Sequence, residues 1–272
     1  MERKKCKRFY TEIVGNEKNN QLGGYFENMS NAHLCTAAAL HDEILRRASE
    51  IRGKVYLFFD EIQEVEAWEK CINSFRVELD CDIYITGSNA RLLSGELATY
   101  LAGRYVEFVI YPFSFAEFIE LYHTVCPDAD IRQCFNKYLT AGGMPYLSNL
   151  RYDEAASRQY LRDLFNSVEL KDIVKRSNIR DVDMLERIVA YITSNIGTTF
   201  SATSISKYLK NEGWSVSPET VLNDIRACMD AFLFYQVKRQ DLPGKKILTV
   251  NEKYYVADHG VREAVFGGNR RD

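Results

Sequence analysis

The chain has 272 residues, a formal net charge of −3, and 46% hydrophobic residues. This length suits about two domains with packed cores, which excludes an intrinsically disordered chain, and no apolar run is long enough to cross a membrane. The seven cysteines contain no C-x-x-C pair and the four histidines lack metal-ligand spacing, so the sequence disfavours a structural zinc site and indicates a reducing, cytoplasmic setting.

The first 24 residues are polar and without periodicity, and they end in Gly23-Gly24, so we expect a loose N-terminal segment. Apolar residues then recur on one stripe between 37 and 51, which predicts a helix. The run Val55–Phe59 is short, β-branched and aromatic. It predicts a buried strand with both faces apolar, as in a parallel sheet that helices cover on each side.

A second helix is expected over Ala67–Leu79, where apolar residues again have helical spacing. The short apolar run Cys81–Ile85 predicts another strand. Strand, helix and strand within about thirty residues are typical of a parallel crossover unit. The sequence therefore predicts an α/β fold.

Polar residues follow both strands, at the edge where open α/β sheets bind ligands. Asp60 and Glu61 come after the first strand, and we expect Asp60 to hold a hydrated Mg²⁺ and Glu61 to polarise a water for attack on a phosphate. Ser88 and Asn89 come after the second, where either could contact a terminal phosphate. The alternative is an acidic loop beside a Gly-Ser-Asn turn that caps the next helix.

A helix is expected near 90–101, followed by Arg104 in a tight turn and by a third apolar strand, Val106–Ile110. In a ring-forming nucleotidase, an arginine at this position could reach the γ-phosphate of a neighbouring subunit. Arg104 would then belong to a homo-oligomer contact. The alternative is an exposed arginine with a structural role.

Helical patterns continue from 113 to 125 and from 131 to 139, and a long stripe from Tyr160 to Ile173 is typical of a helical lid. From residue 182 onward, three helices precede two strand-like runs, Phe232–Arg239 and Lys246–Val250, which together indicate a winged helix. Phosphates of double-stranded DNA are its expected partners. The residues expected to contact them are Asn223 and Arg226 on the third helix and Lys238, Arg239, Lys245 and Lys246 on the wing. Because Glu219, Asp224 and Asp230 dilute the positive charge, a protein–protein spacer is the alternative.

Five motifs in order resemble the ATPase core of prokaryotic AAA-type ATP-binding proteins that carry a C-terminal domain like PD-(D/E)XK nucleases. They are Tyr56–Gln63, Trp68-Glu69, Ile85–Asn89, Leu92–Glu96 with Gly103-Arg104, and Tyr111–Phe118. The resemblance continues through Gly142–Pro145 to Tyr254–Asp258. It implies that ATP and Mg²⁺ are cofactors, and that the catalytic and metal roles fall on Asp60, Glu61, Ser88 or Asn89, and Arg104.

The sequence departs from this family in two places. It contains no G-x-x-x-x-G-K-[ST] P-loop, and the nuclease carboxylates and lysine have no counterparts. We therefore expect a mostly parallel P-loop-type sheet without its first strand and P-loop, a helical lid and a winged helix. The expected boundaries are 1–24 for the loose segment, 25–122 for the truncated ATPase core, 123–181 for the lid, 182–258 for the winged helix, and 259–272 for the start of a truncated C-terminal domain.

The leading interpretation is an AAA-type ATP-binding and ATP-hydrolysing protein that is inactive as this chain, because backbone amides and a lysine to cradle the phosphates are missing. A non-enzymatic DNA-binding or regulatory remnant is the alternative. A helicase box at Asp60–Gln63 is disfavoured, because such helicases need the same P-loop and a Ser-Ala-Thr strand end where this chain has Thr86-Gly87-Ser88.

Overall fold

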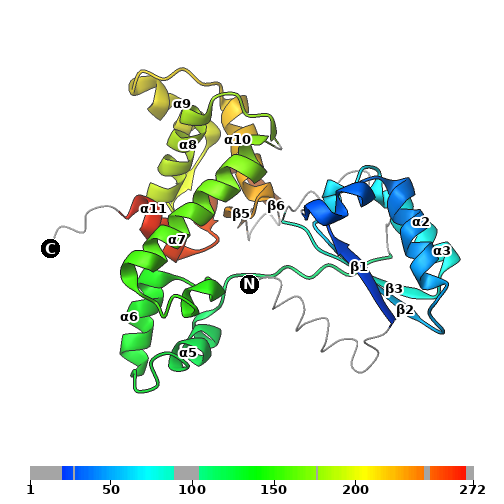
Figure 1. The fold of residues 1–272 in the computed structure, drawn as a ribbon. Coiled ribbons are helices and arrows are strands. Elements are labelled where there is room, and N and C mark those ends of the chain that lie inside the picture. The colour runs from blue at the N-terminus through cyan, green and yellow to red at the C-terminus, as the bar shows by residue number, and fades with distance from the viewer. Residues whose placement is uncertain (1–19, 27, 89–103, 176, 242–245, 268–272) are drawn as a thin grey trace. The chain divides into compact units, whose positions relative to one another are not determined.

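The computed structural model describes residues 20–26, 28–88, 104–175, 177–241 and 246–267 (Figure 1). The chain divides into two compact units, residues 1–108 and 109–272. In the part of the chain that the structure describes, no helix is both long and apolar enough to cross a membrane.

The first unit is an α/β unit built on a three-stranded parallel sheet with the order β1-β2-β3. Two α-helices and two short 3₁₀ helices complete its described part. The elements in chain order are β1 (Gln21–Tyr25), η2 (Met29–Leu34), α2 (Ala37–Ala48), β2 (Val55–Asp60), η3 (Ile62–Glu64), α3 (Trp68–Glu78) and β3 (Cys81–Ile85).

Strand β1 corrects the expectation of a loose segment through residue 24. Its residues pair with β2 in parallel, with Gly24 opposite Phe59. A Cβ atom on Gly23 would lie 1.8 Å from the carbonyl oxygen of Phe58, so only glycine allows β1 to approach β2 this closely. The two glycines that suggested a loop therefore lie within a strand.

One face of this sheet packs against α2 and α3, which lie on the same side of it (Figure 1). Val55, Leu57 and Phe59 are buried in that core. The alternate residues of β2 are only half-buried, and Phe58 stacks on Tyr84 with ring centroids 4.9 Å apart. The expectation of helices on both faces is thus wrong for the described residues, because both helices pack on one face.

The prediction of a third strand at Val106–Ile110 is also wrong. This segment pairs with no other described strand, and its apolar side chains are exposed, with 76% for Val106, 72% for Phe108 and 77% for Ile110. An apolar run becomes a strand only where a neighbouring strand satisfies its backbone N–H and C=O groups. The helix expected near 90–101 lies outside the described residues.

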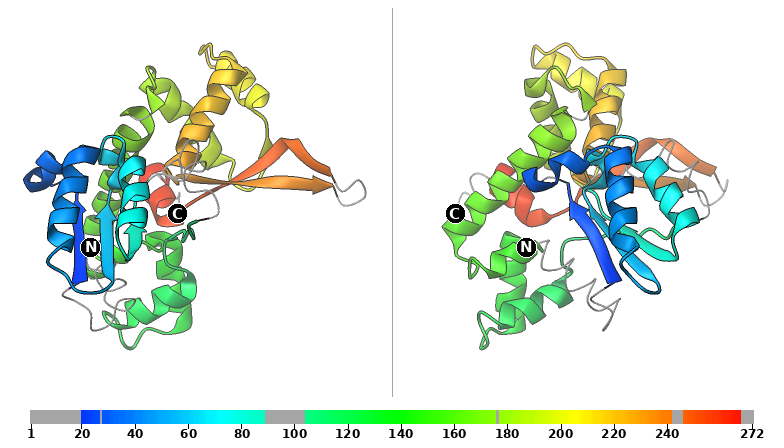
Figure 2. Two further views of the ribbon diagram at one scale, coloured as in Figure 1. Left: turned by 90° about the vertical axis from the view of Figure 1, so that its right-hand side faces the viewer. Right: turned by 45° about the vertical axis from the view of Figure 1, so that its right-hand side comes forward.

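The second unit contains the remaining helices and a small antiparallel sheet with the order β4-β6-β5. The β5–β6 hairpin extends well beyond the helices beside it (Figure 2). Its elements are α5 (Phe115–His123), α6 (Ile131–Ala141), η5 (Pro145–Ser148), α7 (Glu154–Ser167), the π-helical η6 (Val168–Lys175), α8 (Val182–Ser194), β4 (Thr199–Phe200), α9 (Ala202–Asn211), α10 (Pro218–Asp230), β5 (Phe234–Asp241), β6 (Lys246–Val256) and α11 (His259–Phe266).

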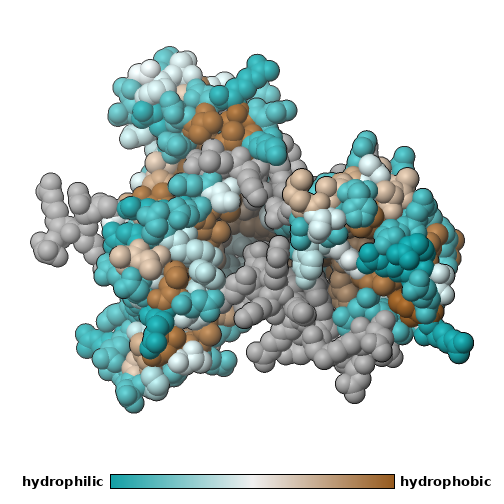
Figure 3. Space-filling view, in the orientation of Figure 1, coloured by the Kyte–Doolittle hydropathy of each residue, from teal (hydrophilic) through white to brown (hydrophobic). Residues whose placement is uncertain are grey.

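A single hydrophobic core runs through this second unit, from Phe118 on α5 to Ala264 on α11. Phe266 at the end of α11 meets Phe165 of α7 edge to face, with ring centroids 5.6 Å apart. Hydrophilic residues cover much of the outer surface of these helices (Figure 3). The segments that the sequence divides at residues 181 and 258 thus share one core, which includes Val261 and Ala264 of α11.

Candidate functional site

The carboxyl ends of β2 and β3 form the candidate site of the first unit. Asp60 is the last residue of β2, and the side-chain hydroxyl of Thr86, the first residue after β3, donates a hydrogen bond to Asp60 Oδ1. Ser88 Oγ lies 3.3 Å from Glu61 Oε2 and donates to it. The parallel register of β2 and β3 places both strand ends at one edge, and each carboxylate therefore contacts a hydroxyl from the neighbouring strand end.

Glu61 has a left-handed backbone, with φ 52° and ψ 48°, where β2 turns into η3. This conformation costs a non-glycine residue about 1–2 kcal/mol. Ile62, the next residue, is fully buried in the core, which holds the turn in place. The backbone therefore ends β2 abruptly, and the Glu61 carboxylate is only half-buried.

Gln63 also contacts this site. Its Nε2 donates to Glu61 Oε2, while its Oε1 is buried without a hydrogen-bond partner among the described residues. Sequence reasoning did not assign roles to Gln63 or to Thr86. Two signals could have pointed to these residues. Thr86 comes directly after the strand Cys81–Ile85, and Gln63 lies within the segment Asp60–Gln63.

The side chains at this edge are hard oxygen donors, the type that Mg²⁺ prefers. Among the described residues, no group of three or more histidine, cysteine, aspartate or glutamate side chains could enclose a metal. Mg²⁺ usually keeps several waters and takes one or two carboxylates together with substrate phosphates. Asp60 and Glu61 therefore fit a magnesium ion that keeps several waters, rather than a closed metal centre.

Arg104, another predicted site residue, takes no part in the contacts described above. Arg104 is exposed and lies at a bend. Asn89 lies outside the described residues, so its place relative to Glu61 is not described. No stretch of the 272 residues has the G-x-x-x-x-G-K-[ST] pattern that would cradle phosphates.

The second unit carries the residues predicted to contact DNA. Asn223 and Arg226 are exposed on α10, and Arg226 Nη1 donates to Asn223 Oδ1 at 3.5 Å. Lys238 is exposed on β5. Arg239 also belongs to β5 and Lys246 begins β6, whereas Lys245 lies outside the described residues.

The sequence suggested that Asp224 dilutes the positive surface charge of α10, but the structure shows that it does not. It is 6% exposed and belongs to the buried residues of that helix. Burial, with a smaller effect from the Asp181 carboxylate, raises the pKa of Asp224 to about 6. Because the exposed face of α10 lacks this carboxylate, it is less acidic than the sequence alone indicates.

Comparisons with known proteins agree with this division of the chain. A family model described as an AAA domain matches residues 7–119, and another, described as a domain of unknown function (DUF8612), matches residues 132–272. A Walker-type ATPase of Pyrococcus abyssi has a similar fold, with a TM-score of 0.50 and 15% identity over 84% of this chain and 66% of that one. The α/β fold and the resemblance to AAA proteins are thus confirmed.

Two curated relatives are longer than this chain. An uncharacterized protein of Haemophilus influenzae is 35% identical over 260 residues, and one of Methanocaldococcus jannaschii is 29% identical over 225 residues. These matches cover 96% and 80% of this chain but only 64% and 50% of the relatives. The second family model matches just over half of the 272 residues, so the chain belongs to the DUF8612 family. Within this chain, the match to the AAA domain precedes the match to that domain of unknown function.

Proposed function

We propose that this protein is an AAA-type ATP-binding protein whose hydrolytic centre lies at the carboxyl ends of β2 and β3. The observation that carries the proposal is the pair of contacts between neighbouring strand ends, from Thr86 to Asp60 and from Ser88 to Glu61. Both carboxylates are thereby fixed at the edge where open α/β sheets bind ligands. The matching AAA family model gives the nucleotide as the expected ligand.

Each residue would have a defined task in this centre. Asp60 would hold Mg²⁺, and the ion would neutralise charge on the phosphate oxygens. Glu61 would accept a proton from water while the water oxygen attacks the γ-phosphorus and the bond to ADP breaks. Gln63 and Ser88 would orient the Glu61 carboxylate, since both donate hydrogen bonds to its Oε2. Arg104 would supply a cation to the transition state in a neighbouring subunit. Asn89 would contact the terminal phosphate.

The missing phosphate cradle limits what these 272 residues can do by themselves. Losing several charge-assisted hydrogen bonds, at about 1.5–3 kcal/mol each, puts the affinity for ATP in the millimolar range or weaker. Catalysis of phosphoryl transfer depends on holding the nucleotide in line with the attacking water. We therefore expect the isolated chain to release no phosphate above a Glu61→Gln control.

The test compares the chain with a fusion that supplies a strand and a G-x-x-x-x-G-K-[ST] loop ahead of it. Calorimetry should show ATP binding to the fusion, and phosphate release should depend on Mg²⁺ and disappear in Glu61→Gln. ATP binding together with hydrolysis that Glu61→Gln leaves unchanged would contradict the role of this centre. Hydrolysis by the unextended chain that Glu61→Gln abolishes would contradict the need for the cradle.

A second candidate function is binding of double-stranded DNA by a winged helix within the second unit. Helices α8, α9 and α10 with strands β4, β5 and β6 follow the element order of that fold. The observation that favours it is the exposed pair Asn223 and Arg226 on the third helix, together with the projecting β5–β6 hairpin (Figure 2). Arg226 and Lys238 are exposed and supply cationic side chains of the type that phosphate contacts use.

Salt dependence tests the DNA hypothesis. With about four phosphate contacts, the slope of log K against log salt should lie near −3 to −4. Replacing Lys245 and Lys246 by alanine should flatten it by about two units. The matched control replaces Lys70 and Arg76, two exposed cations on α3, and should leave the slope unchanged. Absence of binding at low salt would favour the spacer.

A further inference from the structure

The exposed face of α10 carries a stripe of hydrogen-bonding side chains. On its other face Ile225 and Cys228 are buried in the core of the second unit, where α10 packs against α8, α9 and β5 (Figure 1). Glu219, Asn223 and Arg226 are all exposed, and they follow one another at intervals of four and three residues. Because this spacing keeps side chains on one side of a helix, these three residues form one stripe directed away from the core. We call it the α10 stripe.

The charge of the α10 stripe does not suit a phosphate backbone. Glu219 and Arg226 have opposite formal charges and Asn223 is neutral, so the stripe has no excess of positive charge. Contacts to phosphates depend on cations, and the Glu219 carboxylate would repel phosphates. The side chains of Asn223 and Arg226 instead match the edges of bases, since an amide pairs with adenine and a guanidinium with guanine through two hydrogen bonds each.

The ends of the Asn223 and Arg226 side chains lie together. Arg226 Nη1 donates a hydrogen bond to Asn223 Oδ1 over 3.5 Å. A guanidinium has five N–H donors, so Arg226 keeps donors for a base, and the amide of Asn223 keeps its own donors and a second lone pair. Successive bases in a strand of DNA are about 3.4 Å apart along the helix axis. Two side chains whose ends are this close are therefore suited to adjacent base pairs.

The start of α10 is fixed, and exposed cations lie on the elements beside it. Ser217 Oγ caps the helix by accepting from the backbone N–H of Thr220 at 3.0 Å. An α-helix fits the major groove of duplex DNA, which is about 12 Å wide. In helix-turn-helix proteins the helix before the reading helix crosses the DNA backbone. Lys207 and Lys210 on α9 and Lys238 on β5 are exposed cations for such phosphate contacts.

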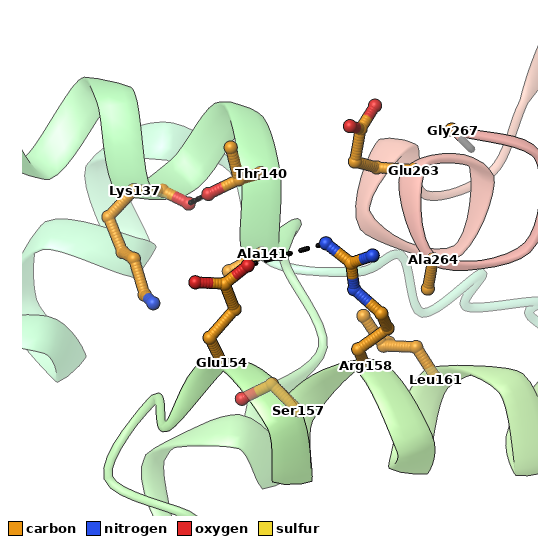
Figure 4. Close-up of a pocket in the computed structure, with 10 residues that line it drawn as sticks. All are labelled: Lys137, Thr140, Ala141, Glu154, Ser157, Arg158, Leu161, Glu263, Ala264 and Gly267. Carbon is orange, nitrogen blue, oxygen red and sulfur yellow. Dashed lines mark hydrogen bonds and ion pairs between the residues drawn. The ribbon is translucent and has the colours of Figure 1, made fainter. Parts of the chain in front are cut away.

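The pocket where α6, α7 and α11 meet is a poorer surface for DNA (Figure 4). Its charged lining residues are two cations, Lys137 and Arg158, and two carboxylates, Glu154 and Glu263. Arg158 also forms an ion pair of 3.3 Å with Glu154. A volume of about 430 Å³ suits a small molecule, whereas specific DNA complexes bury about 1,000–2,500 Å² of protein surface.

We propose that the α10 stripe reads bases in the major groove of duplex DNA, at a step with adenine beside guanine in one strand. This inference rests on the DNA-binding candidate function, and it assigns Asn223 and Arg226 to bases rather than to phosphates. Asn223 would accept a hydrogen bond from the amino group of adenine and donate to its N7. Arg226 would donate to O6 and N7 of guanine. The order of the two bases, AG or GA, is left to the experiment.

The test begins with selection of duplexes by the full chain from a library whose central base pairs are randomised. We expect the selected duplexes to share adenine beside guanine in one strand. Reversing either base pair, so that the two strands exchange bases there, should weaken binding about 5- to 150-fold at a fixed salt concentration. Equal binding of all duplexes with a steep salt dependence would overturn base reading but leave DNA binding intact. Absence of binding at low salt would overturn both.

Two variants separate base contacts from phosphate contacts. Asn223→Ala and Arg226→Ala should each lose the preference at one base pair, and neither should change the slope of log K against log salt. Arg76→Ala, at an exposed arginine of α3, is the control and should change neither preference nor slope. If Arg226→Ala flattens the slope by about one unit and keeps the preference, Arg226 contacts a phosphate and the assignment is wrong.

Base analogues test the individual contacts. In 7-deazaadenine and 7-deazaguanine a carbon replaces N7, while Watson–Crick pairing is kept. The adenine analogue should weaken binding by the parent chain several-fold but leave binding by Asn223→Ala unchanged, because both changes remove the same contact. The guanine analogue should behave in the same way with Arg226→Ala. Losses that add in these combinations would overturn the assignment of each residue to its base.

Discussion

Asp258 Oδ2 accepts a hydrogen bond from the backbone N–H of Gly143 at 2.7 Å, across 115 residues of sequence. The other oxygen, Oδ1, caps α11 by accepting from the backbone N–H of Val261 at 2.9 Å. The carboxyl group is 3% exposed, and its burial raises the pKa of Asp258 against the opposing effect of these backbone donors. Gly143 also accepts a hydrogen bond from the backbone N–H of Phe113 at 2.8 Å.

Three stretches that carry the family resemblance therefore meet in one place: the segment around Phe113, the turn Gly142–Pro145 and the segment that ends at Asp258. Their polar atoms are directed at one another within a packed core. This arrangement gives the motifs a structural role, since they join α5, α6 and α11. No catalytic role is needed to explain why these residue types occur together.

Gly142→Ala should destabilise the chain strongly. The glycine has φ +75°, and an added Cβ would lie 2.2 Å from Asp258 Oδ1 and 2.7 Å from the backbone nitrogen of Gly260. We expect a loss of about 3 kcal/mol or more in the free energy of unfolding, measured in urea. Gly213→Ala is the matched control, because Gly213 has φ +88° but open space around it, so only the backbone cost of about 1 kcal/mol applies. Equal losses would show that the close approach to Asp258 is unimportant.

Asp224 should make stability depend on pH. Its pKa is raised from 3.8 to about 6 by burial, so the folded state favours the neutral carboxyl. The stability that comes from this preference is fully present below pH 3.8, the ordinary pKa of the carboxyl, and is lost as pH rises through about 6. Between pH 4 and pH 7, the free energy of unfolding of Asp224→Asn should therefore rise by up to about 3 kcal/mol relative to that of the parent.

Urea unfolding across that pH range measures the effect of Asp224. Asp128→Asn, at an exposed aspartate, provides the control and should leave the difference from the parent independent of pH. A constant difference for Asp224→Asn would mean that the carboxyl is solvated in the folded chain.

The left-handed backbone of Glu61 predicts an unusual order of substitutions. Alanine and glycine both remove the carboxylate, but only glycine adopts φ 52° without steric cost. Glu61→Gly should thus be more stable than Glu61→Ala by about 1 kcal/mol. At Arg76 in α3 the same pair should show the opposite order, because glycine weakens a helix. If alanine is preferred at both positions, Glu61 has an ordinary backbone.

The two faces of β2 should differ in their tolerance to truncation. Phe59 is fully buried beneath the two helices and meets Phe75 with ring centroids 6.0 Å apart. Phe59→Ala should cost about 3–5 kcal/mol, measured by urea unfolding of the first unit. Phe58→Ala should cost clearly less, because Phe58 lies on the half-buried face of the sheet, where its ring stacks on Tyr84. Equal costs would indicate that a further layer covers this second face.

The sequence by itself determined the elements whose signals are local. The stripes of apolar residues identified α2 and α3, and the apolar runs identified β2 and β3, with Asp60 and Glu61 at the carboxyl end of β2. Ser217 before Pro218 is a local signal of the same kind for the start of α10, because an N-cap side chain and a proline act within one turn. These features need no knowledge of distant residues.

Only the tertiary structure decided the features that depend on partners elsewhere in the chain. Gly23 reads as a loop residue until its close approach to Phe58 is known, and Val106–Ile110 reads as a strand until no described partner is found for it. Likewise Asp224 reads as surface charge until α10 turns it inward. A strand, a buried carboxyl and a junction such as Asp258 with Gly143 exist only through contacts across long sequence separations, which composition and periodicity do not encode.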